Sequence, residues 1–90
     1  MELEVAVEDF DYACRRGRCV LRLVLDPGVA ASLLEQLGAA RRCRLEEPVE
    51  LEVAVEDFDY TCRRSGCLIR LELPEREAER LRSRLASLCL

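Results

Sequence analysis

The sequence predicts an α+β fold, in which one four-stranded antiparallel sheet and two helices on one of its faces form a two-layer sandwich. Three observations support this prediction. A long segment of the chain occurs twice, each copy begins with the two-residue alternation of a β-strand, and each copy ends with apolar residues at helical spacing. The expected element order is therefore ββαββα, and neither copy is large enough to bury its apolar residues alone.

The repeat defines the organisation of the chain. Residues 2–22 recur 48 positions later as residues 50–70, and five of these 21 positions differ. The later parts of the two copies diverge but keep their helix-spaced apolar positions. We therefore expect one domain with these bounds: 1–90 for the domain, 2–45 for the first repeat, 46–49 for the linker and 50–90 for the second repeat.

The first part of each repeat is predicted to form a β-hairpin. Apolar residues occupy odd positions from Leu3 to Val7, and a basic tetrapeptide, residues 15–18, precedes a second alternating segment. The apolar residues change to even positions along the first strand, so we expect a β-bulge or break near Glu8 and Asp9. With the tetrapeptide as the hairpin loop, the expected cross-strand pairs are Cys14 with Cys19, Tyr12 with Leu21 and Phe10 with Leu23.

The second part of each repeat is predicted to form a helix. Asp26 followed by Pro27 provides an N-cap and a first helical residue, so the first helix is expected over about residues 27–43. Pro74 opens the second helix, whose first turn is acidic. The apolar positions expected to face the sheet are Val29, Ala30, Leu33, Leu34 and Leu37 in the first helix and Ala78, Leu81, Leu85 and Leu88 in the second.

The predicted connectivity resembles a circularly permuted ferredoxin-like fold. Antiparallel pairing allows the strand orders 1-2-4-3 and 2-1-3-4, and the order of elements does not choose between them. A resemblance at the level of the fold implies no particular function.

The composition restricts the classes of function. The chain has 14 arginines and no lysine, 18 acidic residues, no histidine and a net charge of −4. Abundant mixed charge and a near absence of amides are typical of thermophilic proteins. The negative net charge argues against nucleic acid as a partner. The chain lacks an apolar run of about 18 residues and the pattern of a signal peptide, so we expect a cytoplasmic protein with no membrane partner.

The cysteines are the main candidates for chemistry, and three interpretations remain open. Cys14 and Cys19, like Cys62 and Cys67, have C-x4-C spacing. In the first interpretation each pair is buried as thiols or joined as a cross-strand disulfide, which would contribute about 2 kcal/mol. In the second, the four thiolates bind one zinc ion. In the third, nearby arginines activate a redox-active dithiol. Two further cysteines are expected to pack at the helix ends or to tether elements: Cys43 and Cys89.

Two other motifs are weaker signals. Acidic pairs with D-x-D spacing, which begin at Asp9 and Asp57, could bind a hard cation but are more typical of turns and bulges. Arginines beside aromatic residues resemble, in composition, the surface of a single-strand nucleic-acid binder, yet alternation places these aromatic rings in the core. The basic hairpin tips consist of Arg15, Arg16, Arg18, Arg63 and Arg64.

The outer face of the sheet is the best candidate for an interface. Hairpin pairing places acidic side chains, arginines and apolar side chains together on this face. A contiguous apolar stripe on a sheet marks an interaction surface. The interface candidates are Val20, Val24, Leu68, Arg22 and Arg70.

These observations predict a small non-enzymatic interaction module or accessory subunit, whose partner is another protein or a second copy of the chain. The sequence contains no histidine, no phosphate-binding glycine loop and no nucleophile motif. The alternative is a cysteine-dependent zinc-binding or nucleic-acid-associated domain that uses the C-x4-C hairpin tips.

Overall fold

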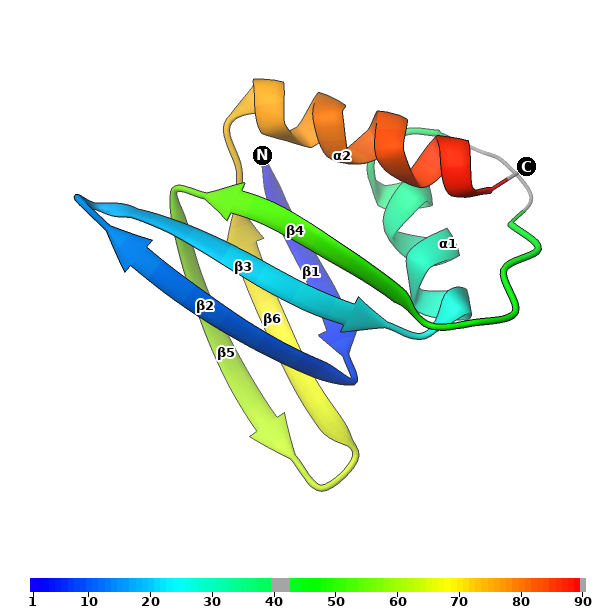
Figure 1. The fold of residues 1–90 in the computed structure, drawn as a ribbon, viewed down its shortest axis with the longest axis horizontal. Helices are drawn as coiled ribbons and strands as arrows, with labels where there is room; N and C mark the ends of the chain where they lie inside the picture. The colour runs from blue at the N-terminus through cyan, green and yellow to red at the C-terminus, as the bar shows by residue number, and fades with distance from the viewer. Residues whose placement is uncertain (40–42, 90) are drawn as a thin grey trace.

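The structure is a computed structural model of the 90-residue chain, and residues 1–39 and 43–89 are described. These residues contain six strands and two helices (Figure 1). The elements are β1 Glu2–Val7, β2 Asp9–Arg15, β3 Arg18–Leu25, α1 Pro27–Gln36, β4 Val49–Val55, β5 Asp57–Arg63, β6 Gly66–Glu72 and α2 Glu75–Leu88.

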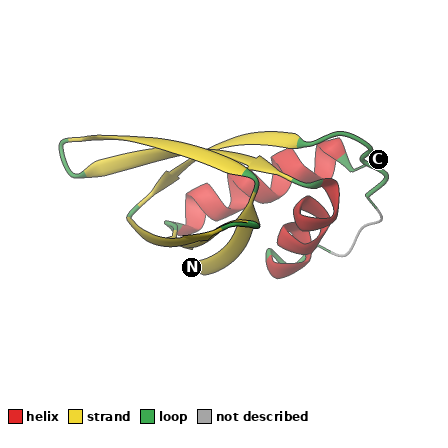
Figure 2. Ribbon diagram, turned by 90° about the horizontal axis from the view of Figure 1, so that it is seen from below, coloured by secondary structure: helices red, strands yellow, loops and turns green. Residues whose placement is uncertain are grey.

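The strands form two three-stranded antiparallel sheets, with the orders β1-β6-β5 and β2-β3-β4. The predicted single four-stranded sheet is therefore wrong, and so are the ferredoxin-like connectivity and both expected strand orders. The strands of the two sheets cross in Figure 1. Figure 2 shows the two helices together at one end of the molecule, while the strands extend away from them.

The prediction failed because the two repeats exchange strands. β1 of the first repeat pairs with β6 of the second, and β4 of the second repeat pairs with β3 of the first. The two pairings have the same register, since Glu2 faces Glu72 in one and its counterpart Glu50 faces Val24 in the other. Each sheet therefore contains strands of both repeats.

The predicted change of register near Glu8 and Asp9 is confirmed. The Glu8 N–H donates to Val24 O over 2.8 Å, and Asp9 faces the same Val24. Two successive residues thus oppose one residue of β3, which defines a β-bulge. Glu56 has the same role in the second repeat and donates to Glu72 O over 2.8 Å. At each bulge the chain leaves one sheet and enters the other, as strands do at the corners of crossed sheets.

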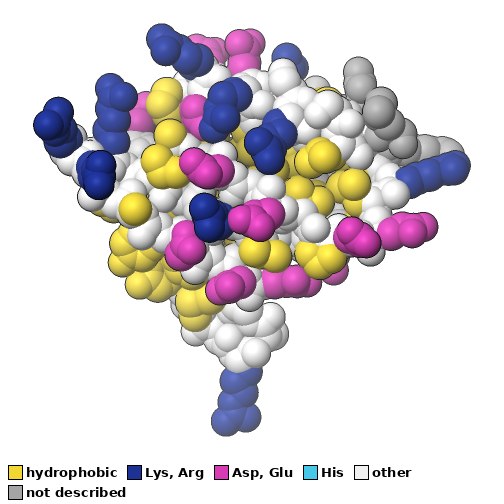
Figure 3. Space-filling model, in the orientation of Figure 1, with side chains coloured by type: hydrophobic (Ala, Val, Ile, Leu, Met, Phe, Trp, Pro, Cys, Tyr) yellow, Lys and Arg dark blue, Asp and Glu magenta, His cyan; other side chains and the backbone are white. Residues whose placement is uncertain are grey.

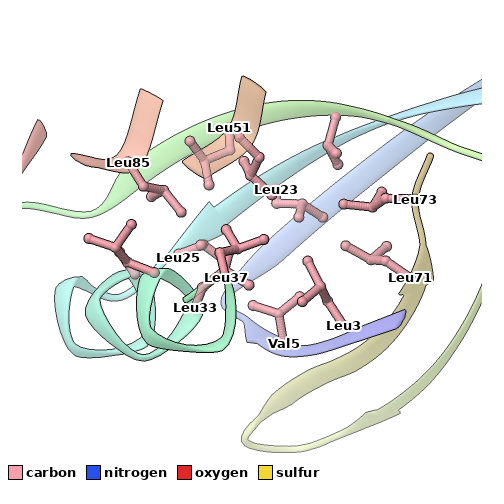
Figure 4. Close-up of a cluster of buried hydrophobic side chains, with 14 of the residues drawn as sticks. Leu3, Val5, Leu23, Leu25, Leu33, Leu37, Leu51, Leu71, Leu73 and Leu85 are labelled. Atoms are coloured by element: carbon pink, nitrogen blue, oxygen red, sulfur yellow. The ribbon is translucent and has the colours of Figure 1, made fainter. Parts of the chain in front are cut away.

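The core lies between the two sheets and the helices. The buried strand residues come from β1, β3, β4 and β6, whose apolar sides face one interior, whereas β2 and β5 contribute no fully buried residue. Figure 4 shows leucine and valine side chains from both sheets and both helices converging there. The labelled residues are Leu3, Val5, Leu23, Leu25, Leu33, Leu37, Leu51, Leu71, Leu73 and Leu85, all of them buried.

Both helices begin where the sequence predicts. Asp26 is the N-cap of α1, its side chain accepts a hydrogen bond from Gly28 N over 2.8 Å, and Pro27 is the first helical residue. α2 follows Pro74 and has an acidic first turn. These starts depend on caps and proline, which are local signals.

The helix ends differ from the prediction. α1 ends at Gln36 rather than near position 43, because Gly38 adopts a left-handed φ of 84° that terminates the helix. Residues 40–42, which the prediction included, lie outside the described residues. In α2, Leu85 is fully buried, but Leu88 is 42% exposed although it continues the apolar spacing.

The two hairpin turns have different backbones. The turn between β2 and β3 consists of Arg16 and Gly17, with φ of 51° and 78°, so the predicted four-residue loop shortens to two residues. Two successive positive φ values are typical of a type I′ hairpin turn. In the second hairpin the residue with positive φ is Gly66, at 127°. A Cβ atom there would lie 2.9 Å from Val7 O in the neighbouring strand, whereas a Cβ on Gly17 would have no neighbour within 4 Å.

This difference predicts unequal effects of two glycine substitutions. Gly17→Ala adds only left-handed backbone strain and should lower the free energy of unfolding by about 1 kcal/mol. Gly66→Ala adds a backbone region that is nearly restricted to glycine and a clash with Val7, so we expect a loss of about 2 kcal/mol or more. Denaturant unfolding measures both values. Equal losses would show that the β1 backbone does not constrain the second turn.

Candidate functional site

A helix side chain covers the outer edge of β1. Gln36, the only side-chain amide of the sequence, accepts a hydrogen bond from Glu4 N over 3.4 Å and donates one to Glu4 O over 3.1 Å. An uncovered strand edge offers its backbone groups to other chains. The contact with Gln36 therefore protects this edge.

α2 covers the outer edge of β4 in the same way. Glu77 Oε1 accepts a hydrogen bond from Ala54 N over 3.2 Å, and Arg80 Nη2 donates to Glu52 O over 3.2 Å. Glu77 and Arg80 also form an ion pair with each other. The hydrogen bond from Arg80 lowers the pKa of Glu77 below its ordinary value, burial opposes this effect, and the hydrogen bond from Ala54 adds to it.

The lowered pKa of Glu77 predicts a pH-dependent contribution to stability. The ionised carboxylate stabilises the fold above the ordinary glutamate pKa of 4.5, and this contribution is lost as pH falls through the lower pKa of the folded state. Thermal melts of the wild type and of Glu77→Gln between neutral and acidic pH should therefore show a difference that shrinks on acidification. Glu79→Gln, at an exposed position of the same helix, is the control. A difference that grows toward acidic pH would contradict the assignment.

The other two sheet edges, on β2 and β5, are open. Each of these strands has a single neighbour in its sheet. Within residues 1–39 and 43–89, the hydrogen bonds at the start of these edges are local: Phe10 N donates to Asp9 Oδ1 and Phe58 N to Asp57 Oδ1, both over 2.9 Å. We call β2 and β5 the open edges.

The register shows which backbone groups the open edges present. A two-residue turn makes Arg15 and Arg18 a hydrogen-bonded pair, and such pairs alternate with non-hydrogen-bonded pairs along the hairpin. Tyr12 and Cys14 belong to non-hydrogen-bonded pairs, so their N–H and C=O groups point away from β3. Tyr60 occupies the equivalent position on β5. Each open edge thus offers donors and acceptors around a tyrosine.

All four aromatic rings of the chain meet between the open edges. Phe10 lies 5.0 Å from Tyr60, and Tyr12 lies 5.1 Å from Phe58, measured between ring centroids. The sequence contains no other aromatic residue. We call this cluster, which consists of Phe10, Tyr12, Phe58 and Tyr60, the aromatic corner.

The aromatic corner is only partly buried. The two phenylalanines pack against the core, but Tyr12 and Tyr60 are 50% and 48% exposed. The expectation that these rings pack in the core is therefore confirmed for the two phenylalanines and wrong for the two tyrosines. Figure 3 shows hydrophobic side chains gathered at the lower left, where the two hairpins diverge in Figure 1. The helices lie at the opposite corner.

The cysteines are joined in pairs. Cys14 bonds to Cys19 and Cys62 to Cys67, each across a hairpin, while Cys43 bonds to Cys89. The hairpin pairs occupy the facing positions that the sequence predicts. The four sulfurs thus form one disulfide in each hairpin rather than four thiolates around one ion. Among the described residues, no group of three or more His, Cys, Asp or Glu side chains could hold a metal ion.

The predicted interface residues do not form one stripe. Val20 and Leu68 are 39% and 46% exposed, but they lie in different sheets, because the expected single sheet is split in two. Arg22 and Arg70 face acidic residues of neighbouring strands, as predicted. Arg22 Nε forms an ion pair with Glu50 Oε1 and Arg70 Nε forms one with Glu2 Oε1, both at 3.4 Å. Val24 is half-buried.

The basic tips are separate as well. Arg15, Arg16 and Arg18 lie at the β2–β3 turn, whereas Arg63 and Arg64 lie at the β5–β6 turn. The two turns point in different directions in Figure 1. The structure therefore brings together the aromatic residues of the two repeats but not their arginine tips.

The open edges and the role of Gln36 could not be predicted from the sequence, because pairing between the repeats determines which strands lie at the edges. A signal was present for the aromatic corner, since all four rings lie in the two D-F-D-Y segments.

No helix in the described part of the chain has the length and apolar character needed to span a membrane. Comparison with protein-family models, curated proteins and solved structures finds no match for this chain.

Proposed function

We propose that this protein is a non-enzymatic interaction module that binds a polypeptide partner at the aromatic corner through its open edges. The observation that carries the proposal is that helix side chains cover two of the four sheet edges and leave the other two open. Helix side chains protect β1 and β4, whereas β2 and β5 present backbone groups next to half-exposed tyrosines.

The physical chemistry of the corner suits protein recognition. A strand added to a sheet edge gains main-chain hydrogen bonds, and neighbouring side chains provide selectivity. Tyrosine supplies a large apolar surface with a polar end, which is why it is frequent in interfaces. The disulfides of the two hairpins hold each edge in register next to the rings.

Site-specific photocrosslinking tests the proposal. A benzophenone amino acid is placed at Tyr12 or Tyr60, and at the exposed Arg82 of α2 as a control, in the full chain. The proteins are irradiated alone and in an extract of the source organism. We expect covalent adducts with a polypeptide, either a second copy or another protein, from positions 12 and 60 but not from 82. Equal yields at all three positions, or no polypeptide adduct at 12 and 60, would refute the proposal.

The remaining expectations from the sequence stay predictions. These are the lack of catalytic activity, the cytoplasmic location and the absence of nucleic-acid and membrane partners. The three disulfides bear on the second of these, because such bonds form in oxidising compartments and, in hyperthermophiles, inside the cell as well.

A further inference from the structure

We infer that the partner of the aromatic corner is a second copy of this chain, which pairs edge to edge in a twofold dimer. The inference rests on the proposed function, because it names the partner of the same surface. In this dimer β2 lies antiparallel to β2 of the second copy, and β5 lies antiparallel to β5.

The open-edge strands are self-complementary in charge. β2 has the sequence DFDYACR and β5 has the sequence DFDYTCR. When two copies of β2 lie antiparallel with Tyr12 facing Tyr12, Asp9 of each copy faces Arg15 of the other. The same register on β5 places Asp57 opposite Arg63. Opposite charges on facing residues favour this register over its neighbours.

The backbone supports the same register. Tyr12 presents its N–H and C=O outward, so two facing Tyr12 residues form a hydrogen-bonded pair at the centre of the new ladder. Tyr60 is equivalent on β5. Cys14 faces Phe10 of the other copy in this register and donates its outward N–H to Phe10 O, which extends the ladder on either side of the tyrosine, while the Phe10 N–H keeps its bond to Asp9 Oδ1.

One twofold axis can satisfy both edges. β2 and β5 bound the same corner and cross there, with their rings in contact. A rotation of 180° about an axis along the view of Figure 1, through this corner, reverses the direction of both strands. The copy then lies beside β2 in one sheet and beside β5 in the other, at one strand spacing of about 4.8 Å. Two continuous six-stranded sheets result, and none of the four edge strands of either copy stays open.

The accessible surface area of the chain is larger than that expected for a compact monomer, as a chain with an unoccupied interface would show. The accessible area is 6420 Å² for a chain of 10.3 kDa. A compact monomer of this mass is expected to expose about 5,400 Å², which leaves an excess of about 1,000 Å². In a standard-size interface each partner buries about 800 Å². The excess is therefore about as large as the area that each partner buries in a standard-size dimer.

Charge-swapped chains provide the test. Sedimentation or light scattering of the wild type over a range of concentrations should give about twice the mass of 10.3 kDa. The variant Asp9→Arg with Asp57→Arg places like charges opposite Arg15 and Arg63 and should raise the dissociation constant at least about tenfold. The opposite variant, Arg15→Asp with Arg63→Asp, should behave alike. An equimolar mixture of the two variants should restore the dimer, because each chain then supplies the charge that the other lacks.

A second variant removes the central backbone donors of the open edges together with the tyrosine rings, without altering charge. Tyr12→Pro with Tyr60→Pro removes the central outward N–H of each open edge, while the hydrogen bonds to β3 and β6 are retained because Pro is tolerated on edge strands. This chain should be monomeric with an unchanged far-ultraviolet circular dichroism spectrum, which reports the backbone.

The outcomes separate this inference from the proposed function. A wild type that is monomeric at all concentrations, or a dimer that survives both charge swaps, overturns the inference. If crosslinks from positions 12 and 60 then reach another polypeptide, the proposed function stands with a different partner. If those positions give no polypeptide adduct, both fail.

Discussion

Removal of the Cys43–Cys89 disulfide is expected to lower the free energy of unfolding by about 4 kcal/mol, the largest effect of any single bond in this chain. The two cysteines are 46 residues apart in the sequence, so the bond restricts a loop that includes most of the second repeat. Each hairpin disulfide joins residues only five apart and should contribute about 2 kcal/mol. Because small domains are stable by only about 5–15 kcal/mol, the long-range bond accounts for a large part of the total.

Denaturant unfolding of Cys43→Ala with Cys89→Ala measures this effect. The matched control is Cys14→Ala with Cys19→Ala, which removes the same number of sulfurs. The denaturant dependence should also rise in the first variant, because its unfolded state is less restricted and exposes more surface. Equal losses in the two variants would mean that the length of the closed loop does not determine the contribution.

Leu85→Ala is expected to lower the free energy of unfolding by about 3 kcal/mol. Leu85 is fully buried where α2 faces the core, so its truncation removes apolar contacts and leaves a cavity between helix and sheets (Figure 4). Leu88 belongs to the same apolar spacing in the sequence but is 42% exposed. Leu88→Ala should therefore change stability by less than about 1 kcal/mol.

The comparison of these two variants tests where the core ends. Both substitutions remove the same atoms from the same helix, and Ala is a better helix former than Leu, so a lower helix propensity cannot explain a loss of stability in either variant. Chemical denaturation of both chains gives the two values directly. A loss for Leu88→Ala as large as that for Leu85→Ala would contradict the exposure of the last turn of α2.

The stability of the fold and the recognition of a partner depend on different parts of each repeat. Sheets and helices share one apolar interior, whereas the aromatic corner is held by phenylalanines that reach the core and tyrosines that do not. Substitution of the tyrosines should thus affect partner binding more than folding. Tyr12 and Tyr60 are therefore suitable positions for the crosslinking and dimerisation experiments.

Features that depend on neighbours along the chain could be predicted from the sequence. The repeat, the facing of Cys14 with Cys19, the bulge at Glu8 and the starts of both helices are all present. Alternation, caps and proline act over a few residues, so the rest of the fold does not alter them. Gly38, which ends α1, is a local signal of the same kind, because a glycine after the last helical turn is typical of helix ends.

The choice of strand partner was decided only by the tertiary structure. β1 and β4 share the sequence ELEVAV, so alternation alone assigns either strand equally well to either repeat. A single residue, Glu8, connects β1 to β2 and is too short to reverse the chain, which must therefore bend into the other sheet. Strand exchange between the repeats, the open edges and the aromatic corner all follow from that bend, because periodicity determines which face of a strand is buried but not which strand lies beside it.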